Sequence, residues 1–288
     1  MHRILIFNLG GTSTKLAVFD EETLVVEGTI RHTDREIQGC TDNAEQIAFR
    51  RGAIEAWLLE NHISLDDLSA VVIRSSGAGL CKKGGTYLVT GKLRDGMYAA
   101  YRGSFPKAPH PSFIVLPLAD EILGSRPIPI YIVDPDGVDE FQDVAYITGH
   151  PDLPRSSGFH VLNHKAIARK ASRDLGKRYE DADLVVAHMG GGISIAAHRH
   201  GLVVDSTSGG SAGEGPFGTN RTGPLPLNKL VDRCFSGAYT KSEIMDLIMT
   251  QGGFLAHTGC TDLRIIEQKA ADGDAHCDLI IRAFIYQV

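Results

Sequence analysis

The sequence contains no apolar run of about 18 residues, the length a helix needs to cross a membrane. Its apolar start, Arg3–Phe7, is too short for the hydrophobic region of a signal peptide. Positive charge is not in excess either, since 29 basic residues stand against 35 acidic ones and give a net charge of -6. That balance argues against a general nucleic-acid-binding surface. We therefore expect a cytoplasmic protein that needs neither a membrane nor a nucleic acid as partner.

Cysteine is scarce: the five cysteines are an odd number and contain no C-x-x-C pair, as is typical of free thiols in a reducing compartment. Several motifs are also missing, namely a Walker A loop, G-x-G-x-x-G before a helix, H-E-x-x-H and G-x-S-x-G. These absences weaken the interpretations as a P-loop protein, a Rossmann protein, a zinc protease and a serine hydrolase. We expect His198-Arg199-His200 to be an exposed hairpin tip rather than a metal site.

The pattern of apolar residues predicts an α/β fold. Strands are expected at Arg3–Phe7, Lys15–Asp20, Leu24–Arg31, Leu68–Arg74, Ile128–Val133, Asp183–His188, Ile193–His198 and Leu202–Asp205. Helices are expected at about Asp42–Asn61, Leu116–Leu123 and Leu162–Leu175. A chain of 288 residues fits one large domain or two medium ones.

The two halves of the chain repeat one arrangement. The run Asn8-x-Gly10-Gly11-x-Ser13 lies between two predicted strands, and His188-x-Gly190-Gly191-x-x-Ser194 lies between two others, each pair being followed by a third strand. This echo predicts a duplication. Gly, Pro and Asp cluster at Gly149–Pro154, so we expect domains at 1–150 and 151–288.

The first hairpin has the composition of a phosphate clamp. It reads Asn8-Leu9-Gly10-Gly11-Thr12-Ser13-Thr14-Lys15. Glycine lets backbone N–H groups approach an anion, while the hydroxyl groups and the lysine add donors and a positive charge. The amide oxygen of Asn8 suits hydrated Mg²⁺. The hairpin alone also fits a plain tight turn with polar filler.

Five further residues are candidates for chemistry. Arg74 and Asp134 follow predicted strands, and Arg221 lies in the glycine-rich segment Gly215–Gly223. Arginine addresses phosphate or carboxylate bidentately, and Asp134 suits Mg²⁺ or an orienting role. His160 and His188 are candidate donors to a transferring phosphoryl group. Surface arginines, a helix-capping aspartate and structural histidines remain open alternatives at these positions.

Taken in order, the motifs resemble the acetate and butyrate kinase (acetokinase) family of the actin-like ATPase superfamily, most closely its butyrate kinase branch. They are Asn8–Lys15, Gly84–Tyr87, Val133–Pro135, Val138–Glu140, Phe159-His160-x-x-Asn163, Ala187–Ser194, Gly213–Phe217, Cys234–Gly237 and Gly252-Gly253. Leu9 stands where the family usually has proline, and Ser75-Ser76 replace glycines. His110-x-Ser112 is matched to a His-Ala-Ser pattern.

The resemblance implies two actin-like (ribonuclease H-like) domains with a ligand cleft between them. It also implies direct transfer of the γ-phosphoryl group of ATP, with Mg²⁺, to a short-chain carboxylate, reversibly forming butyryl phosphate and ADP from butyrate. Carboxylate kinases of other chain lengths, for acetate, propionate or branched acids, are the nearest alternatives. A homo-oligomer, a dimer or larger, is implied as well.

Matching positions receive roles from the same resemblance. The residues that would face the nucleotide are Asn8, Gly10, Gly11, Thr12, Ser13, Thr14, Lys15, Gly190, Gly191, Gly192, Asp262 and Arg264. The catalytic residues would be Arg74, Asp134, His160, His188 and Arg221. Mg²⁺ would be held by Asn8 and Asp134. Family members continue beyond an apolar helix such as Asp278–Val288 with further strands, a glycine-rich adenosine loop and an acidic Mg²⁺ ligand. We therefore expect a second domain that is incomplete at its C-terminus. This leaves a non-catalytic nucleotide-binding protein, or a sugar kinase of the same superfold, as alternatives.

Overall fold

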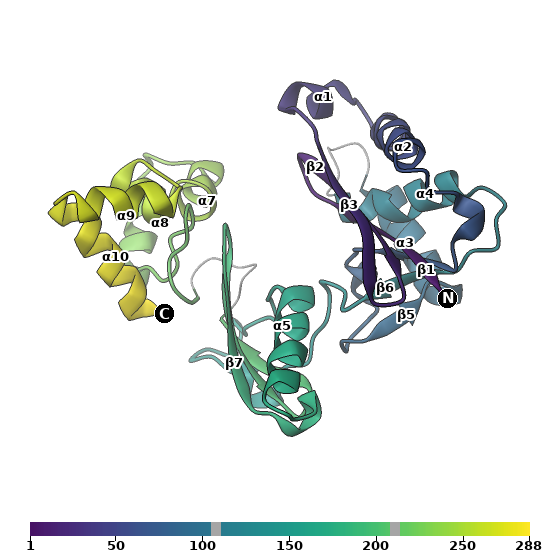
Figure 1. The fold of residues 1–288 in the computed structure, drawn as a ribbon. Helices are drawn as coiled ribbons and strands as arrows, with labels where there is room; N and C mark the ends of the chain where they lie inside the picture. Colours follow the sequence, from purple (N-terminus) through teal and green to yellow (C-terminus); the bar gives the residue numbers. More distant parts are fainter. Residues whose placement is uncertain (105–110, 208–213) are drawn as a thin grey trace. The chain divides into compact units, whose positions relative to one another are not determined.

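The computed structural model describes residues 1–104, 111–207 and 214–288, except for the side chains of residues 34 and 38. His110 and Gly213, both quoted in the motifs above, lie outside the described residues. The chain separates into two compact units, Met1–Val138 and Asp139–Val288 (Figure 1). The domain limits 1–150 and 151–288 stay a prediction.

The first unit is built on a six-stranded sheet. Its strands are β1 (Arg3–Leu9), β2 (Ser13–Asp20), β3 (Thr23–Arg31), β4 (Ala70–Ile73), β5 (Thr86–Leu88) and β6 (Ile130–Val133), in the order β3-β2-β1-β4-β6-β5. Strand β1 is antiparallel to β2 and parallel to β4, which is parallel to β6. The carboxyl ends of β1, β4 and β6 therefore meet at one edge of the sheet, where α/β proteins bind ligands.

Helices complete this unit: α1 (Asp34–Gly39), α2 (Asn43–Glu60), α3 (Gly91–Gly103) and α4 (Pro111–Leu123). Helix α2 begins at Asp42, whose carboxylate accepts the Glu45 N–H at 2.8 Å, and it ends at Asn61, as the sequence predicts. Helices α2 and α4 share one apolar core with the sheet. Leu5, Phe7, Val71, Ile73 and Ile132 from the strands are fully buried in it.

The second unit contains a three-stranded antiparallel sheet, β7 (Leu184–Met189), β8 (Ile193–Arg199) and β9 (Leu202–Ser206), in that order. Helix α5 (Val161–Asp174) contacts β7. The remaining helices are α6 (Leu227–Cys234), α7 (Lys241–Met249), α8 (Gly253–Thr258), α9 (Leu263–Ala271) and α10 (Ala275–Gln287) (Figure 1). The last three of them pack around Phe217, Phe254, Ile266 and Phe284.

The predicted duplication is confirmed at the level of strand topology. Each unit has a glycine hairpin between its first two strands and a third strand antiparallel to the second. The register even shifts in the second strand of both meanders, after Val18 and after Ala197. All five cysteines are free thiols, as expected. Among the described helices, none is both long and apolar enough to span a bilayer.

One expectation from the sequence is wrong. His198 is not at an exposed hairpin tip, because only 2% of its surface is accessible. Side chains alternate along a strand, so Ser194, Ala196 and His198 of β8 share the buried face. The exposed turn begins only at Arg199 and His200.

Candidate functional site

The first glycine hairpin joins β1 and β2. The Gly10 N–H donates to the Ser13 carbonyl at 2.8 Å and closes the turn. Asn8 and Lys15 are paired across the two strands. Both line a cavity of about 470 Å³ on the meander, together with Ile6, Leu16, Ala17, Glu27, Gly28 and Thr29. An amide oxygen and an ammonium group thus share one polar recess below the turn.

Arg50 of α2 supports this hairpin from the interior. Its Nη2 donates to the Gly10 and Gly11 carbonyls, both at 2.9 Å, and its Nη1 donates to the Ser13 carbonyl at 3.1 Å. The residue is fully buried, and burial lowers its pKa to about 10. Among the described side chains, no carboxylate forms an ion pair with Arg50. A buried positive charge therefore lies directly beneath the turn that the sequence predicts to bind phosphate.

Arg50 was missed at the sequence level, although a signal exists. It follows Ile47 by three residues and precedes Ile54 by four, so it belongs to the apolar face of α2. A charge on such a face must be compensated by hydrogen bonds. Here the carbonyl oxygens of the hairpin provide them.

Thr14 departs from the predicted set of phosphate-facing hydroxyls. It is fully buried, and its Oγ1 accepts a hydrogen bond from Arg50 Nη1 at 2.9 Å and lies 2.8 Å from His32 Nε2. The cause is strand alternation, because Thr14, Leu16 and Val18 all point into the core. Thr14 supports the hairpin from within instead of presenting a donor at its surface.

Arg74 and Asp134 lie at the shared carboxyl edge of β4 and β6. The Arg74 N–H donates to the Phe7 carbonyl at 2.9 Å, and its guanidinium lies 3.2 Å from Asp136. Arg74 is partly open, with 41% of its side chain accessible, whereas Asp134 is 1% accessible. Asp134 adopts a left-handed φ of 42° and accepts the Gly85 N–H at 2.8 Å. A strained conformation fixed by such contacts is common at functional sites.

The second glycine hairpin joins β7 and β8 and is closed by a 3.1 Å hydrogen bond from the Gly190 N–H to the Gly192 carbonyl. A Cβ atom at Gly192 would lie 3.2 Å from Arg221 Nη1 and equally close to His160 Nε2. Gly192 therefore leaves room for a guanidinium and an imidazole to approach the same backbone segment. Thr219, two residues before Arg221, donates to the Gly191 carbonyl at 3.4 Å.

The two candidate histidines lie against each other. The rings of His160 and His188 are stacked with centroids 3.8 Å apart and planes 14° from parallel. His188 Nδ1 is 2.5 Å from the amide nitrogen of Asn163, and burial lowers the pKa of His188. Within the second unit the structure thus gathers His160, His188 and Arg221 around Gly192.

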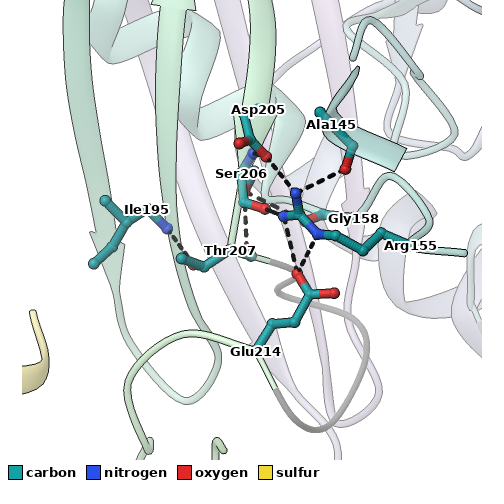
Figure 2. A network of polar contacts seen from close by, with 8 residues as sticks. All are labelled: Ala145, Arg155, Gly158, Ile195, Asp205, Ser206, Thr207 and Glu214. Atoms are coloured by element: carbon teal, nitrogen blue, oxygen red, sulfur yellow. Dashed lines mark hydrogen bonds and ion pairs between the residues drawn. The ribbon is translucent and has the colours of Figure 1, made fainter. Parts of the chain in front are cut away.

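Arg155 fixes the segment that leads into His160. Its guanidinium lies 3.0 Å from Asp205 and 3.0 Å from Glu214, and it donates to the Ala145 and Ser206 carbonyls (Figure 2). Hydrogen bonds to the two carboxylates raise the pKa of Arg155. The network ties the 145–155 segment to the end of β9, next to the chain that places His160.

Asp262 and Arg264 lie at the start of α9. Asp262 caps the helix by accepting the Arg264 N–H at 3.0 Å, and the two side chains form an ion pair at 2.5 Å. They partner each other rather than the histidines or the glycine hairpin. Across the described ranges, no group of three or more His, Cys, Asp or Glu side chains is arranged to hold a metal ion.

Comparisons with known proteins agree with this architecture. A sequence model of the acetokinase family matches residues 150–288. A protein named probable butyrate kinase, from Clostridium botulinum (strain Alaska E43 / Type E3), is 40% identical over 289 residues, covering 100% of this chain and 79% of that protein. Butyrate kinase 1 of Clostridium acetobutylicum is 40% identical over 290 residues, with the same coverage of both chains.

Solved structures show the same fold at low sequence identity. Porphyromonas gingivalis acetate kinase has a TM-score of 0.77 at 18% identity, covering 100% of this chain and 77% of that one. A propionate kinase from Francisella tularensis has a TM-score of 0.73 at 19% identity, covering 100% and 78%. The fold is that of the actin-like ATPases, as the sequence predicts. The relatives at 40% identity then show the family: this chain belongs to the acetokinase family.

Proposed function

We propose that this protein transfers the γ-phosphoryl group of ATP directly to the carboxylate of a short-chain fatty acid, with butyrate as the preferred acceptor. The observation that carries the proposal is the gathering of His160, His188 and Arg221 around Gly192. Phosphoryl transfer needs positioning and charge neutralisation more than covalent help from the protein. Two imidazoles and a guanidinium at a glycine hairpin supply donors for the oxygens of the group in transfer.

In the first unit, the hairpin from Asn8 to Lys15 would bind phosphate, and Arg74 would hold the substrate carboxylate bidentately. A carboxylate acceptor is already ionised at neutral pH, so no general base is required. Asp134 would orient the site through its fixed position at the end of β6. Asp262 and Arg264 would lie near the nucleotide, as the sequence resemblance implies.

Mg²⁺ fits the donor chemistry of the first unit. Asn8 and Asp134 offer amide and carboxylate oxygens, the ligands that this ion prefers, at strands whose carboxyl ends share one edge. When bound, the ion would neutralise charge on the β- and γ-phosphates.

The proposal includes a cytoplasmic location and a homo-oligomer. We propose butyrate rather than acetate or propionate as the preferred acceptor, because the relatives at 40% identity are named butyrate kinases.

A hydroxamate assay with ATP and Mg²⁺ tests the reaction, using butyrate, propionate, acetate and a branched acid in parallel. Butyrate should give the highest kcat/KM. Arg221→Ala should lower kcat on the order of 10³-fold, because it removes a guanidinium from the transferring group. Arg199→Ala is the matched control, since Arg199 is exposed and lies 4.0 Å from its nearest carboxylate partner, Asp183.

Three outcomes would contradict the proposal. ATP binding without turnover of any acid would indicate a non-catalytic nucleotide-binding protein. Turnover of sugars but not of carboxylates would indicate a sugar kinase. Equal loss of activity in the Arg199→Ala and Arg221→Ala variants would remove the specific role of Arg221.

A further inference from the structure

A continuous line of hydrogen-bonding side chains runs from the interior of the second unit to His160. Tyr179 Oη lies 2.7 Å from His198 Nδ1, and His198 Nε2 lies 3.4 Å from His164 Nδ1. His164 Nε2 lies 2.8 Å from Ser194 Oγ, which lies 2.8 Å from His160 Nδ1. The line links a 3₁₀ turn, strand β8, helix α5 and the candidate catalytic histidine.

The intermediate members are enclosed. Ser194 and His164 have no accessible surface, and His198 and Tyr179 are 2% and 7% accessible. Burial lowers the pKa of both His164 and His198 to about 4, with a further lowering from His198 and His188 at His164 and from Lys165 at His198. Both rings are therefore neutral at physiological pH. A neutral imidazole has one N–H donor and one acceptor nitrogen. If a ring accepts a hydrogen bond at one nitrogen, it therefore donates one at the other.

Tyr179, at the interior end of the line, sets the direction in which hydrogen bonds are donated along it. A phenol is a much stronger acid than the N–H of a neutral imidazole, so Tyr179 donates its proton to His198 Nδ1. His198 must then carry its own proton on Nε2 and donate to His164 Nδ1. By the same reasoning His164 carries its proton on Nε2 and donates to Ser194 Oγ. The partner of one ring nitrogen decides the state of the other.

The partners of Ser194 Oγ determine where its hydroxyl proton points. Its Oγ also accepts the backbone N–H of His160 at 3.3 Å. With both lone pairs taken, by that N–H and by His164, the hydroxyl proton is left for His160 Nδ1. His160 Nδ1 is thus an acceptor, and the ring proton resides on Nε2.

We propose that Ser194, His164, His198 and Tyr179 are positioning residues that hold His160 in its Nε2–H tautomer. The opposite tautomer would present a lone pair on Nε2, which repels an anion. The Nε2–H form presents a donor beside Gly192, where Arg221 also lies. The role of that donor in catalysis rests on the phosphoryl transfer proposed above, whereas the tautomer itself does not.

Long-range ¹H–¹⁵N correlation spectra of the whole protein, labelled with ¹⁵N-histidine, test the tautomer directly. Single His→Gln variants assign the rings. We expect His160, His164 and His198 all to show a protonated Nε2 and an unprotonated Nδ1. A protonated Nδ1 at His160 in the unmodified protein overturns the proposal.

Two variants test the connection. Ser194→Ala should leave His160 exchanging between tautomers and lower kcat on the order of 10–100-fold, with a smaller change in KM. Tyr179→Phe removes the phenol that donates to His198 Nδ1, so His198 should exchange between its two tautomers. Ser172→Ala is the matched control, because Ser172 is equally buried but donates only to the Ala168 carbonyl within α5.

The outcomes separate this inference from the proposed function. An unchanged His160 tautomer in a folded Ser194→Ala variant contradicts the proposed control of that tautomer by Ser194, whatever the activity. Failure to phosphorylate any carboxylate, with the three Nε2–H tautomers present, contradicts the proposed function but not the tautomer assignment.

Discussion

Lys165 and Glu140 form an ion pair in the interior of the second unit, with Nζ and Oε2 2.7 Å apart and side chains only 2% and 1% accessible. Glu140 also accepts the Val203 N–H at 2.9 Å, and Lys165 donates to the Gly201 carbonyl at 3.2 Å. The pair therefore joins α5 to the strand that follows the β8–β9 turn.

Lys165→Met should destabilise the second unit by about 3–5 kcal/mol, because it removes the buried ammonium group that lies 2.7 Å from the Glu140 carboxylate. Urea unfolding followed by far-UV circular dichroism measures the change. The double variant with Glu140→Gln should recover part of the loss. Lys170→Met is the control, since Lys170 forms an exposed pair with Asp174 on the same helix. Similar losses for the two lysines would contradict the assigned importance of burial.

Arg50→Met should destabilise the first unit by at least about 2 kcal/mol, because the carbonyls of Gly10, Gly11 and Ser13 lose the hydrogen bonds that Arg50 donates. It should also weaken ATP binding, measured by calorimetry, with Arg50→Lys intermediate. Trp57, the only tryptophan, lies in this unit and reports its unfolding by fluorescence. Arg51→Met is the neighbouring control, because Arg51 is exposed and pairs with Glu55 and Glu121. Wild-type affinity in Arg50→Met would exclude a role in shaping the hairpin.

Acidification should destabilise the second unit through His164 and His198. Their folded pKa of about 4 lies below the ordinary value of 6.5, so the unfolded chain binds protons that the folded chain does not. Stability is fully present above about pH 6.5 and falls as the pH drops toward 4. For one such histidine the loss between pH 7.5 and pH 5 is about 2 kcal/mol.

Urea midpoints at the two pH values measure this loss. Lys165, His188, Ser194 and Tyr179 face the two rings, and none of these four is a carboxylate that would stabilise a protonated imidazole. His164→Gln should be less stable than the unmodified protein at pH 7.5 and less sensitive to acid. An equal acid sensitivity in the variant would show that the histidines do not control the transition.

Gly192→Ala should reduce kcat more than it reduces stability. Its methyl group would lie 3.2 Å from both Arg221 Nη1 and the His160 ring, so one of them must move from the hairpin. Small displacements of catalytic groups can cost on the order of 100-fold in rate. Steady-state kinetics and thermal unfolding measure the two effects. Gly149→Ala controls for the loss of a glycine, since a methyl group added there would meet no atom within 4 Å beyond its chain neighbours.

Local features were predictable from the sequence. The first strands, the caps of α2 and both glycine hairpins follow from short-range patterns that need no knowledge of the rest of the chain. The gathering of His160, His188 and Arg221 was suggested by family motifs rather than by geometry. Contacts between segments distant in sequence, such as Arg221 beside Gly192, required the structure.

Three places where the structure differs from what composition suggests have a common physical cause. Thr14, Arg50 and His198 are polar residues that lie inside, whereas polarity alone places such residues outside. Alternation along β2 and β8 and the face of α2 carried the correct signal. Composition alone favours the surface for Thr14, Arg50 and His198, whereas their positions on the strands and on the helix favour the interior.

The support of the Gly10–Ser13 turn by Arg50 has a consequence for folding. A β-hairpin ordinarily forms from adjacent residues within microseconds, but this one depends on a side chain 37 to 40 positions further along the chain. Its final shape must wait until α2 docks on the sheet. A nascent chain that ends before Arg50 would hold both strands of the hairpin without the group that sets its geometry. The phosphate binding proposed for this hairpin would thus be acquired with tertiary packing, and not when the first two strands pair.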